Sequence, residues 1–111
     1  MNKDKRTPTY DLDDVKAAAR IGNVCLTKRV SRSLINHGYI DLDDFVCCML
    51  QVLDSSYFYK SSELENLRGV YADIYRCVPY AGDEWYVKFF QDADGKNYVN
   101  VWSLKPDGSM Y

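Results

Sequence analysis

The spacing of hydrophobic side chains changes its period once along this 111-residue chain. Between residues 11 and 53, hydrophobic residues recur at intervals of three and four, as they do on the buried side of an amphipathic helix. From Tyr57 onward the period falls to two, and aromatic and β-branched residues dominate, as in half-buried strands. The pattern therefore predicts helices followed by strands.

Three helices are expected in the first part, because each hydrophobic stretch begins after a residue that can cap a helix. The predicted N-caps are Asp11, Thr27 and Asp41, the last with Asp44 three residues later as a variant of the capping box. Gly22 can end the first helix, the second is expected to end at residues 36–38, and the third to run through residues 45–53. A short extended segment is expected over residues 24–26.

Turn residues divide the second part into strands. The predicted strands lie near residues 72–80, 84–91 and 97–105, with tight turns at residues 81–83 and 92–96. Within the second turn, Asp94-Gly95 is the strongest hairpin dipeptide of the chain. The sequence leaves open whether residues 62–71 form a helical turn or a loop.

These elements predict one α+β domain over residues 1–111, with three N-terminal helices packed on one face of a C-terminal antiparallel β-sheet meander. The other face of the sheet is then left for a ligand. Residues 1–9 are polar and show no period, so we expect a flexible or loosely docked N-terminal arm.

Composition narrows the class of protein. The chain is 47% hydrophobic and 27% charged, as in an ordinary globular domain, and no hydrophobic run approaches the ~20 residues that cross a bilayer. The charged N-terminus does not resemble a secretory signal, so we expect a cytoplasmic protein. The four cysteines lack C-x-x-C spacing, and His37, the one histidine, has no second ligand at a usual distance. We therefore expect no metal and no other cofactor.

Basic and aromatic side chains gather in the strand half of the chain. Side chains alternate across a strand, so Tyr86 and Lys88 share one face, while Trp85, Val87 and Phe89 face the helices. Further candidates for the Tyr86 face, depending on strand register, are Lys60, Tyr75, Arg76 and Lys105. The net charge of −2 means that binding of RNA, the polyanion such a face suits best, must depend on this focused patch.

Such a face has the groups that RNA cleavage without a metal needs. A base must remove the proton of the 2'-hydroxyl, an acid must protonate the leaving 5'-oxygen, and positive charge must stabilise the phosphorane. Lysine and arginine supply the charge, and tyrosine or lysine can be base or acid if neighbouring charges lower a pKa that lies near ~10. The expected products carry 2',3'-cyclic phosphate and 5'-hydroxyl ends. For any one residue, a solvated surface role is the competing interpretation.

Five short runs of this sequence resemble, in order and spacing, the motility quorum-sensing regulator toxins, the MqsR family. The runs are Lys5-Arg6-Thr7-Pro8, Phe58-Tyr59-Lys60-Ser61, Asp73-Ile74-Tyr75-Arg76, Tyr86-Val87-Lys88 and Ser103-Leu104-Lys105. The resemblance implies a RelE-like fold and a bacterial toxin of a type II toxin–antitoxin pair. Such a toxin is an mRNA interferase that cleaves at short GC-containing motifs. Its cognate antitoxin neutralises it and carries the zinc and the DNA-binding module.

Carried over residue by residue, the resemblance makes Lys60, Tyr86 and Lys105 the catalytic residues. We assign Arg76, Lys88 and Tyr75 to RNA binding. One family position is changed, because Ala72 stands where the family has a glutamine, just before the Asp73-Ile74-Tyr75-Arg76 run. Either Arg68, Tyr71 or another polar group replaces that glutamine, or activity and sequence preference differ.

The chain is also compatible with two other functions. The leading alternative is a catalytically weak or inactive homologue that binds an antitoxin and acts as a regulatory module, which Ala72 and the sequence pI of about 5.3 favour. A small-molecule-binding domain is the third hypothesis, and no Gly-rich phosphate loop or cofactor motif supports it. Cleavage of RNA separates the first hypothesis from both others.

Overall fold

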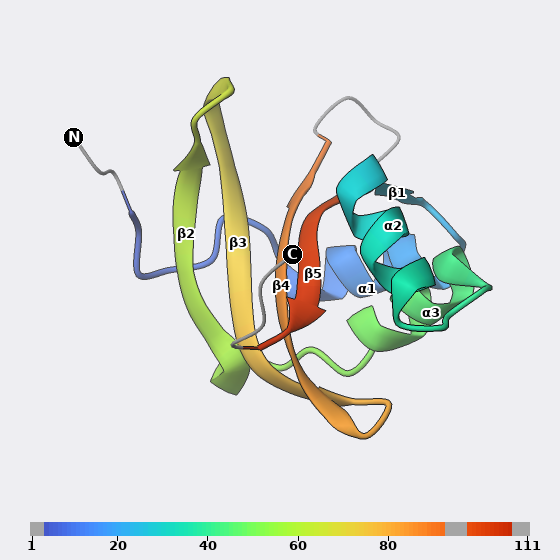
Figure 1. The fold of residues 1–111 in the computed structure, drawn as a ribbon. Coiled ribbons are helices and arrows are strands. Elements are labelled where there is room, and N and C mark those ends of the chain that lie inside the picture. The colour runs from blue at the N-terminus through green and yellow to red at the C-terminus, as the bar shows by residue number, and fades with distance from the viewer. Residues whose placement is uncertain (1–3, 93–97, 108–111) are drawn as a thin grey trace.

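The computed structural model describes residues 4–92 and 98–107 as an α+β domain, which confirms the predicted fold class (Figure 1). The helical half contains α1 (Leu12–Arg20), strand β1 (Val24–Leu26), α2 (Lys28–Asn36), α3 (Leu42–Leu50) and the 3-10 turn η1 (Ser55–Tyr57). The strands that follow are β2 (Phe58–Leu64), β3 (Leu67–Tyr80), β4 (Asp83–Gln91) and β5 (Val99–Pro106). Within the described ranges, no helix has the length and apolar character needed to span a membrane.

All five strands form one sheet in the order β1-β5-β4-β3-β2. Strands β2 to β5 are an antiparallel meander. The prediction of a meander is confirmed for β3, β4 and β5, and β2 extends it beyond the strands that were predicted. Strand β1, however, pairs parallel to β5, with Val24 opposite Val99 and Leu26 opposite Val101. The sheet is therefore mixed, and the prediction of a purely antiparallel sheet was wrong, because a three-residue extended segment gives no indication of its partner. The RelE-like assignment, which comes from the resemblance, stays a prediction.

The predicted caps of the first two helices are confirmed. The Asp11 side chain accepts a hydrogen bond from the backbone N–H of Asp13, and Thr27 accepts one from Val30, so both satisfy N–H groups at helix starts. Asp41 occupies the N-cap position of α3 without a side-chain cap bond, so the predicted capping-box variant does not form. Helix α3 ends at Leu50, three residues earlier than expected.

The helices cover only part of the sheet. Their buried side chains, which include Val15, Val30, Leu34, Val46 and Met49, form one core with the inward residues of β4 and β5. Figure 1 shows the three helices gathered on one side of β1, β5 and β4, with β2 and β3 extending beyond them. The predicted helix-on-sheet packing is therefore correct for the β1–β5–β4 half. It was wrong for β2 and for the part of β3 that extends beyond the helices, whereas Tyr75 and Val78 of β3 still belong to the common core.

The N-terminal segment covers that remaining half. Lys5 and Ser61 exchange backbone hydrogen bonds of 2.7 and 2.9 Å, so the segment pairs with the outer edge of β2. The buried Asp73 carboxylate of β3 accepts the backbone N–H groups of Thr9 and Tyr10, at 2.9 to 3.0 Å. From Asp4 onward, the arm that we expected to be loosely docked is thus tied to the sheet.

The connection between β3 and β4 follows from its turn residues. Tyr80 pairs with Asp83 across the two-residue turn Ala81-Gly82, where both φ angles are positive (51° and 77°), as a type I' hairpin turn requires. This turn confirms the prediction for residues 81–83. The open segment 62–71 is neither a helical turn nor a long loop, because β2 and β3 run through it and pair Leu64 with Leu67. The predicted Asp94-Gly95 turn lies outside the described residues.

Candidate functional site

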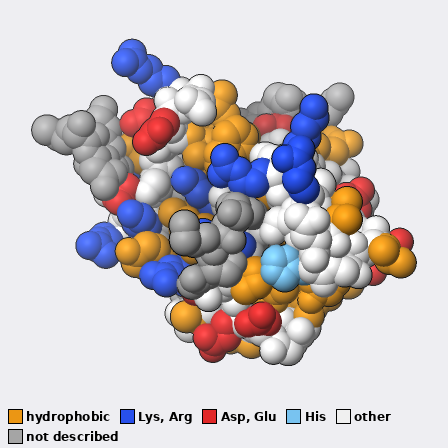
Figure 2. Space-filling model, in the orientation of Figure 1, with side chains coloured by type: hydrophobic (Ala, Val, Ile, Leu, Met, Phe, Trp, Pro, Cys, Tyr) orange, Lys and Arg blue, Asp and Glu red, His pale blue; other side chains and the backbone are white. Residues whose placement is uncertain are grey.

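Alternation along β4 separates the two faces of the sheet as predicted. Trp85, Val87 and Phe89 are 1%, 0% and 0% exposed and belong to the core beneath the helices. Tyr86 and Lys88 therefore point to the other side, which we call the open face. In Figure 2, Lys and Arg side chains lie interspersed with hydrophobic ones over the strand half of the molecule.

Strand register aligns the candidate residues in two rows across the open face. In the first row Lys60 pairs with Ile74, Ile74 with Lys88, and Lys88 with Ser103. Lys60 and Lys88 are thus two strands apart, or about 10 Å between Cα atoms. In the second row Tyr86 pairs with Lys105, whose Nζ lies 5.3 Å from the centre of the Tyr86 ring. The three predicted catalytic residues therefore share one face, although they come from β2, β4 and β5.

Two β-bulges add Arg76 and Tyr59 to this face. Tyr75 pairs with Val87, and Val78 pairs with Trp85. Two residues of β3, Arg76 and Cys77, therefore lie opposite the single residue Tyr86 of β4. A second register shift, between Phe58 and Lys60, leaves Tyr59 without a cross-strand partner. The Tyr59 ring centre lies 5.4 Å from Lys60 Nζ and 5.3 Å from the guanidinium carbon of Arg76. Tyr59 was not among the predicted site residues, since a bulge cannot be counted from strand alternation.

The carboxylate of Asp4 reaches the open face from the N-terminal segment. Its Oδ2 accepts a bond of 2.7 Å from Lys60 Nζ, and its Oδ1 accepts one of 2.6 Å from Ser62 Oγ. The hydrogen bond from Lys60 raises the pKa of that ammonium. An anion is therefore already bound at the first predicted catalytic residue.

The carboxylate of Asp107 binds Arg76 much as that of Asp4 binds Lys60. Its carboxylate accepts Arg76 Nη2 at 2.9 Å and the backbone N–H of Cys77, the bulge residue with φ of 57°, at 2.9 Å. The hydrogen bond with Arg76 lowers the pKa of Asp107 and raises that of Arg76. Asp107 thus fixes both the bulge and the guanidinium direction, and no sequence motif indicated it.

Lys88 lies at the centre of the face, between the β2 and β5 sides. Burial, and then the charge of Lys60, lower the pKa of its ammonium. Its cross-strand partner Ile74 is buried but lies outside the main core. The open face combines these cations with the exposed ring of Tyr59 and the partly exposed ring of Tyr86, which is typical of sites for single-stranded nucleic acid.

Tyr75, which we assigned to RNA binding, does not lie with the other candidates. It is fully buried, its ring stacks on Phe89 at 5.7 Å, and it meets Phe58 edge-on at 5.5 Å. Burial raises the pKa of its hydroxyl strongly, and that hydroxyl has no hydrogen-bond partner in the described structure. Tyr75 therefore lies on the core side of β3, and the structure does not bring it together with the other candidates.

Ala72 occupies an open-face position but has no polar replacement beside it on β3. It is fully buried and pairs with Ser62, whose hydroxyl is engaged with Asp4. Tyr71, one of the proposed replacements, points to the opposite face, where Lys5 Nζ lies 4.3 Å from its ring centre. The chemistry of a glutamine is therefore not restored by Tyr71.

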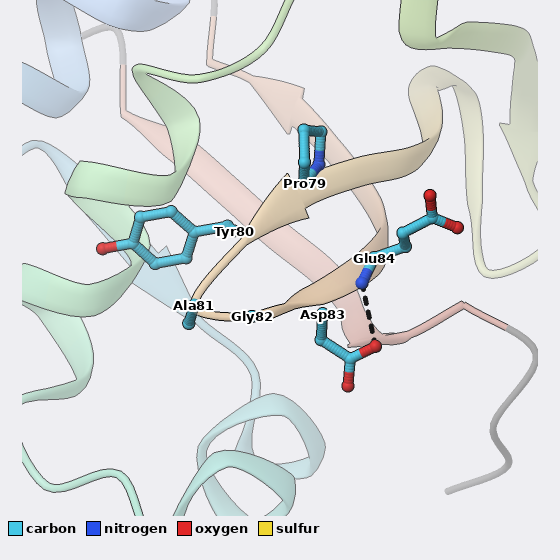
Figure 3. A pocket seen from close by; sticks show the side chains of 6 residues that line it. All are labelled: Pro79, Tyr80, Ala81, Gly82, Asp83 and Glu84. Atoms are coloured by element: carbon cyan, nitrogen blue, oxygen red, sulfur yellow. Dashed lines mark hydrogen bonds between the residues drawn. The ribbon is translucent and has the colours of Figure 1, made fainter.

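The open face is distinct from the hollow at the β3–β4 turn. That hollow, of about 610 Å³, is lined by residues 79–84 of a single hairpin. In Figure 3 the Tyr80 ring points away from Asp83 and Glu84, and Asp83 accepts the backbone N–H of Glu84 at 2.8 Å. Its two carboxylates disfavour a polyanion. Among residues 4–92 and 98–107, no group of three or more His, Cys, Asp or Glu side chains is placed to hold a metal ion.

The fold and the open face together define a small α+β domain with a basic, aromatic sheet surface. Comparison with known families assigns it more closely. A family model described as "Motility quorum-sensing regulator, toxin of MqsA" matches residues 7–105. The chain therefore belongs to the motility quorum-sensing regulator toxin family, as its five short runs predicted, and is the toxin of a toxin–antitoxin pair with MqsA as the antitoxin of the family. No curated protein matches the chain.

Proposed function

We propose that this toxin is a metal-independent endoribonuclease, an mRNA interferase that cleaves at short GC-containing motifs and is neutralised by its cognate antitoxin. The observation that carries the proposal is the convergence of Lys60, Tyr86 and Lys105 on one face of the sheet. Arg76 and Lys88 add charge to the same face, although the whole chain is net negative. We place the reaction in the bacterial cytoplasm, where mRNA and antitoxin are made.

The proposed reaction is an internal transesterification. The 2'-oxygen attacks the adjacent phosphorus while a basic group takes its proton, and the bond from phosphorus to the 5'-oxygen breaks as that oxygen receives a proton. The products are a 2',3'-cyclic phosphate and a 5'-hydroxyl. Base and acid come from Lys60, Tyr86 and Lys105, and the ammonium of Lys105 beside the Tyr86 ring places positive charge next to the phenol.

Arg76 and Lys88 bind and polarise the phosphate. A guanidinium can donate two parallel hydrogen bonds to phosphate oxygens, and Asp107 already directs that of Arg76. Lys88 is partly desolvated at the centre of the face, so its charge acts through a lower local dielectric than that of a surface lysine. Together they offset the negative charge that develops on the phosphorane.

The test is cleavage of a synthetic RNA oligonucleotide by the pure protein in EDTA, with both ends of each product identified. We expect cyclic phosphate and 5'-hydroxyl ends. Lys60→Ala, Tyr86→Phe and Lys105→Ala should each lower the rate by about 10²- to 10⁴-fold, the usual contribution of a general acid or base. Lys28→Ala, which removes an exposed lysine of α2, is the matched control and should cleave normally. Activity that is lost in EDTA, or that survives all three substitutions, contradicts the proposal.

One observation favours a second function, an antitoxin-binding regulatory module with little or no activity. Ala72 is buried, its cross-strand partner Ser62 is already bonded to Asp4, and Tyr71 does not replace the family glutamine. Under this alternative, micromolar protein leaves RNA intact but still binds the antitoxin, which we expect to carry the zinc and the DNA-binding module. Growth arrest on expression, relieved by co-expression of that antitoxin, supports the enzyme instead.

A further inference from the structure

An aromatic pair extends the open face beyond its cations. The ring centres of Phe90 on β4 and Trp102 on β5 lie 5.9 Å apart, with the planes inclined by 56°. Phe90 follows the core residue Phe89, so alternation turns it to the open face, and its contact with Trp102 places both rings there. Both side chains remain partly exposed. The chain's other tryptophan, Trp85, is buried in the core.

A break in strand pairing accounts for the position of Trp102. Phe89 pairs with Val101 and Lys88 with Ser103, so Trp102 is an extra residue without a cross-strand partner. Such bulges redirect a side chain and are common beside functional sites. Here the bulge turns a large aromatic ring to solvent directly next to the row that contains Lys60 and Lys88.

The position beside the pair on β3 is apolar and buried. Ala72 lies one residue from Asp73, the partner of Phe89, and therefore faces Phe90 across the strands. Its methyl group is fully buried and donates no hydrogen bond, so it offers a ligand no polar contact. The apolar groups that a base can reach here are the partly exposed rings of Phe90 and Trp102.

We propose that Trp102, with Phe90 beside it, stacks a nucleobase of the RNA whose phosphates lie on Lys60, Lys88 and Arg76. A nucleobase is the flat, partly apolar group that accompanies a phosphate chain, and stacking on aromatic side chains is the usual way in which single strands are held. The inference rests on the proposed RNA substrate. It adds that one base is held by stacking on its flat face. The methyl group of Ala72 makes no hydrogen bond to the edge of that base.

The test measures binding of a short, fully 2'-O-methylated RNA, which cannot be cleaved, by fluorescence anisotropy and by quenching of tryptophan emission. Stacking of one base is worth about 1–3 kcal/mol, so Trp102→Leu should weaken binding about 5- to 150-fold. Trp102→Phe keeps an aromatic face and should retain most of the affinity. RNA should quench wild-type emission, and quenching should disappear in Trp102→Leu, because Trp85 is buried.

Controls separate stacking from loss of structure. Phe45→Leu makes the same kind of change at a partly exposed ring of α3, within the helical layer, and should bind RNA as the wild type does. A series of oligonucleotides, each lacking the base at one position, locates the stacked base. When that base is the missing one, Trp102→Leu should cause no further loss of affinity.

The outcomes distinguish this inference from the proposed function. If wild type binds and Lys88→Ala weakens binding while Trp102→Leu does not, the stacking proposal is wrong and the RNA site remains. Equal losses in Trp102→Phe and Trp102→Leu also overturn stacking. If the wild type neither binds nor cleaves RNA, both proposals are wrong.

Discussion

Asp4 occupies the position where an RNA phosphate would meet Lys60. Its carboxylate accepts the Lys60 ammonium at 2.7 Å and the Ser62 hydroxyl at 2.6 Å, so a phosphate must displace it. Asp4→Asn removes the charge and nearly preserves the size of the side chain. We predict that this variant binds RNA more tightly, and that the pKa of Lys60 falls toward its ordinary value because the charged hydrogen-bond partner is gone.

The solvent exposure of Lys60 and Asp4 limits how much Asp4→Asn can change the affinity for RNA. The side chains of Lys60 and Asp4 are 27% and 20% exposed, so solvent screens their attraction. Partly exposed ion pairs contribute about 0.2–1 kcal/mol. Displacing the carboxylate therefore costs no more than about 1 kcal/mol, and its removal should tighten RNA binding by at most about fivefold.

The assay is anisotropy with the 2'-O-methylated RNA at low and at physiological salt. Asp43→Asn makes the same change in net charge at an exposed position in the first turn of α3, so it controls for the global field. Lys60→Ala, alone and combined with Asp4→Asn, completes a double-mutant cycle. RNA affinity should increase in Asp4→Asn and not in Asp43→Asn. The increase should vanish when Asp4→Asn is combined with Lys60→Ala.

Three results would contradict the proposed competition between Asp4 and RNA. If Asp4→Asn binds RNA no more tightly than the wild type, RNA does not compete with the carboxylate. An equal gain in Asp43→Asn would show a nonspecific charge effect. A gain that persists without Lys60 would show that Asp4 acts through another group.

Three further predictions concern stability, measured by urea unfolding. Phe89→Ala should cost about 3–5 kcal/mol, because it empties a fully buried site stacked on Tyr75; a loss under 1 kcal/mol contradicts the described core. Asp73→Ala should cost about 2–3 kcal/mol, because it leaves the backbone N–H groups of Thr9 and Tyr10 without their acceptor; unchanged stability would show that the N-terminal segment is not docked. Asp107→Asn should destabilise the protein at pH 7 and should destabilise it less at pH 3. The pKa of Asp107 is lowered in the folded state, so its contribution is present above the unfolded value of 3.8 and is lost as pH falls through the folded value. Equal destabilisation at both pH values would contradict the role of the charge.

Hydrophobic period and caps predicted the helices and the orientation of β4, because both depend on neighbours close in sequence. Asp11 and Thr27 cap their helices within three residues, and Trp85, Val87 and Phe89 alternate with Tyr86 and Lys88 over a single strand. Each of these relations joins residues close in sequence, so the local pattern of residues is enough to predict it.

The parts that could not be predicted depend on contacts between distant segments. Asp4 reaches Lys60, and Asp107 reaches Arg76, through strand register and bulges that no local pattern encodes. The bulge at Trp102 likewise follows from how β5 pairs with β4. Residues 62–71 were left undecided because their polar side chains favour neither strand nor helix, and pairing across the turn determined their structure.

The proposed function requires that RNA binds the open face of the sheet, across β2 to β5. Amide chemical shifts of the ¹⁵N-labelled protein, titrated with the 2'-O-methylated RNA, test this claim directly. We predict that the largest changes occur around Lys60, Arg76, Lys88, Trp102 and Lys105, with the amides of α1 and α3 little affected. Changes confined to the helical layer, or none at micromolar RNA, would contradict the account.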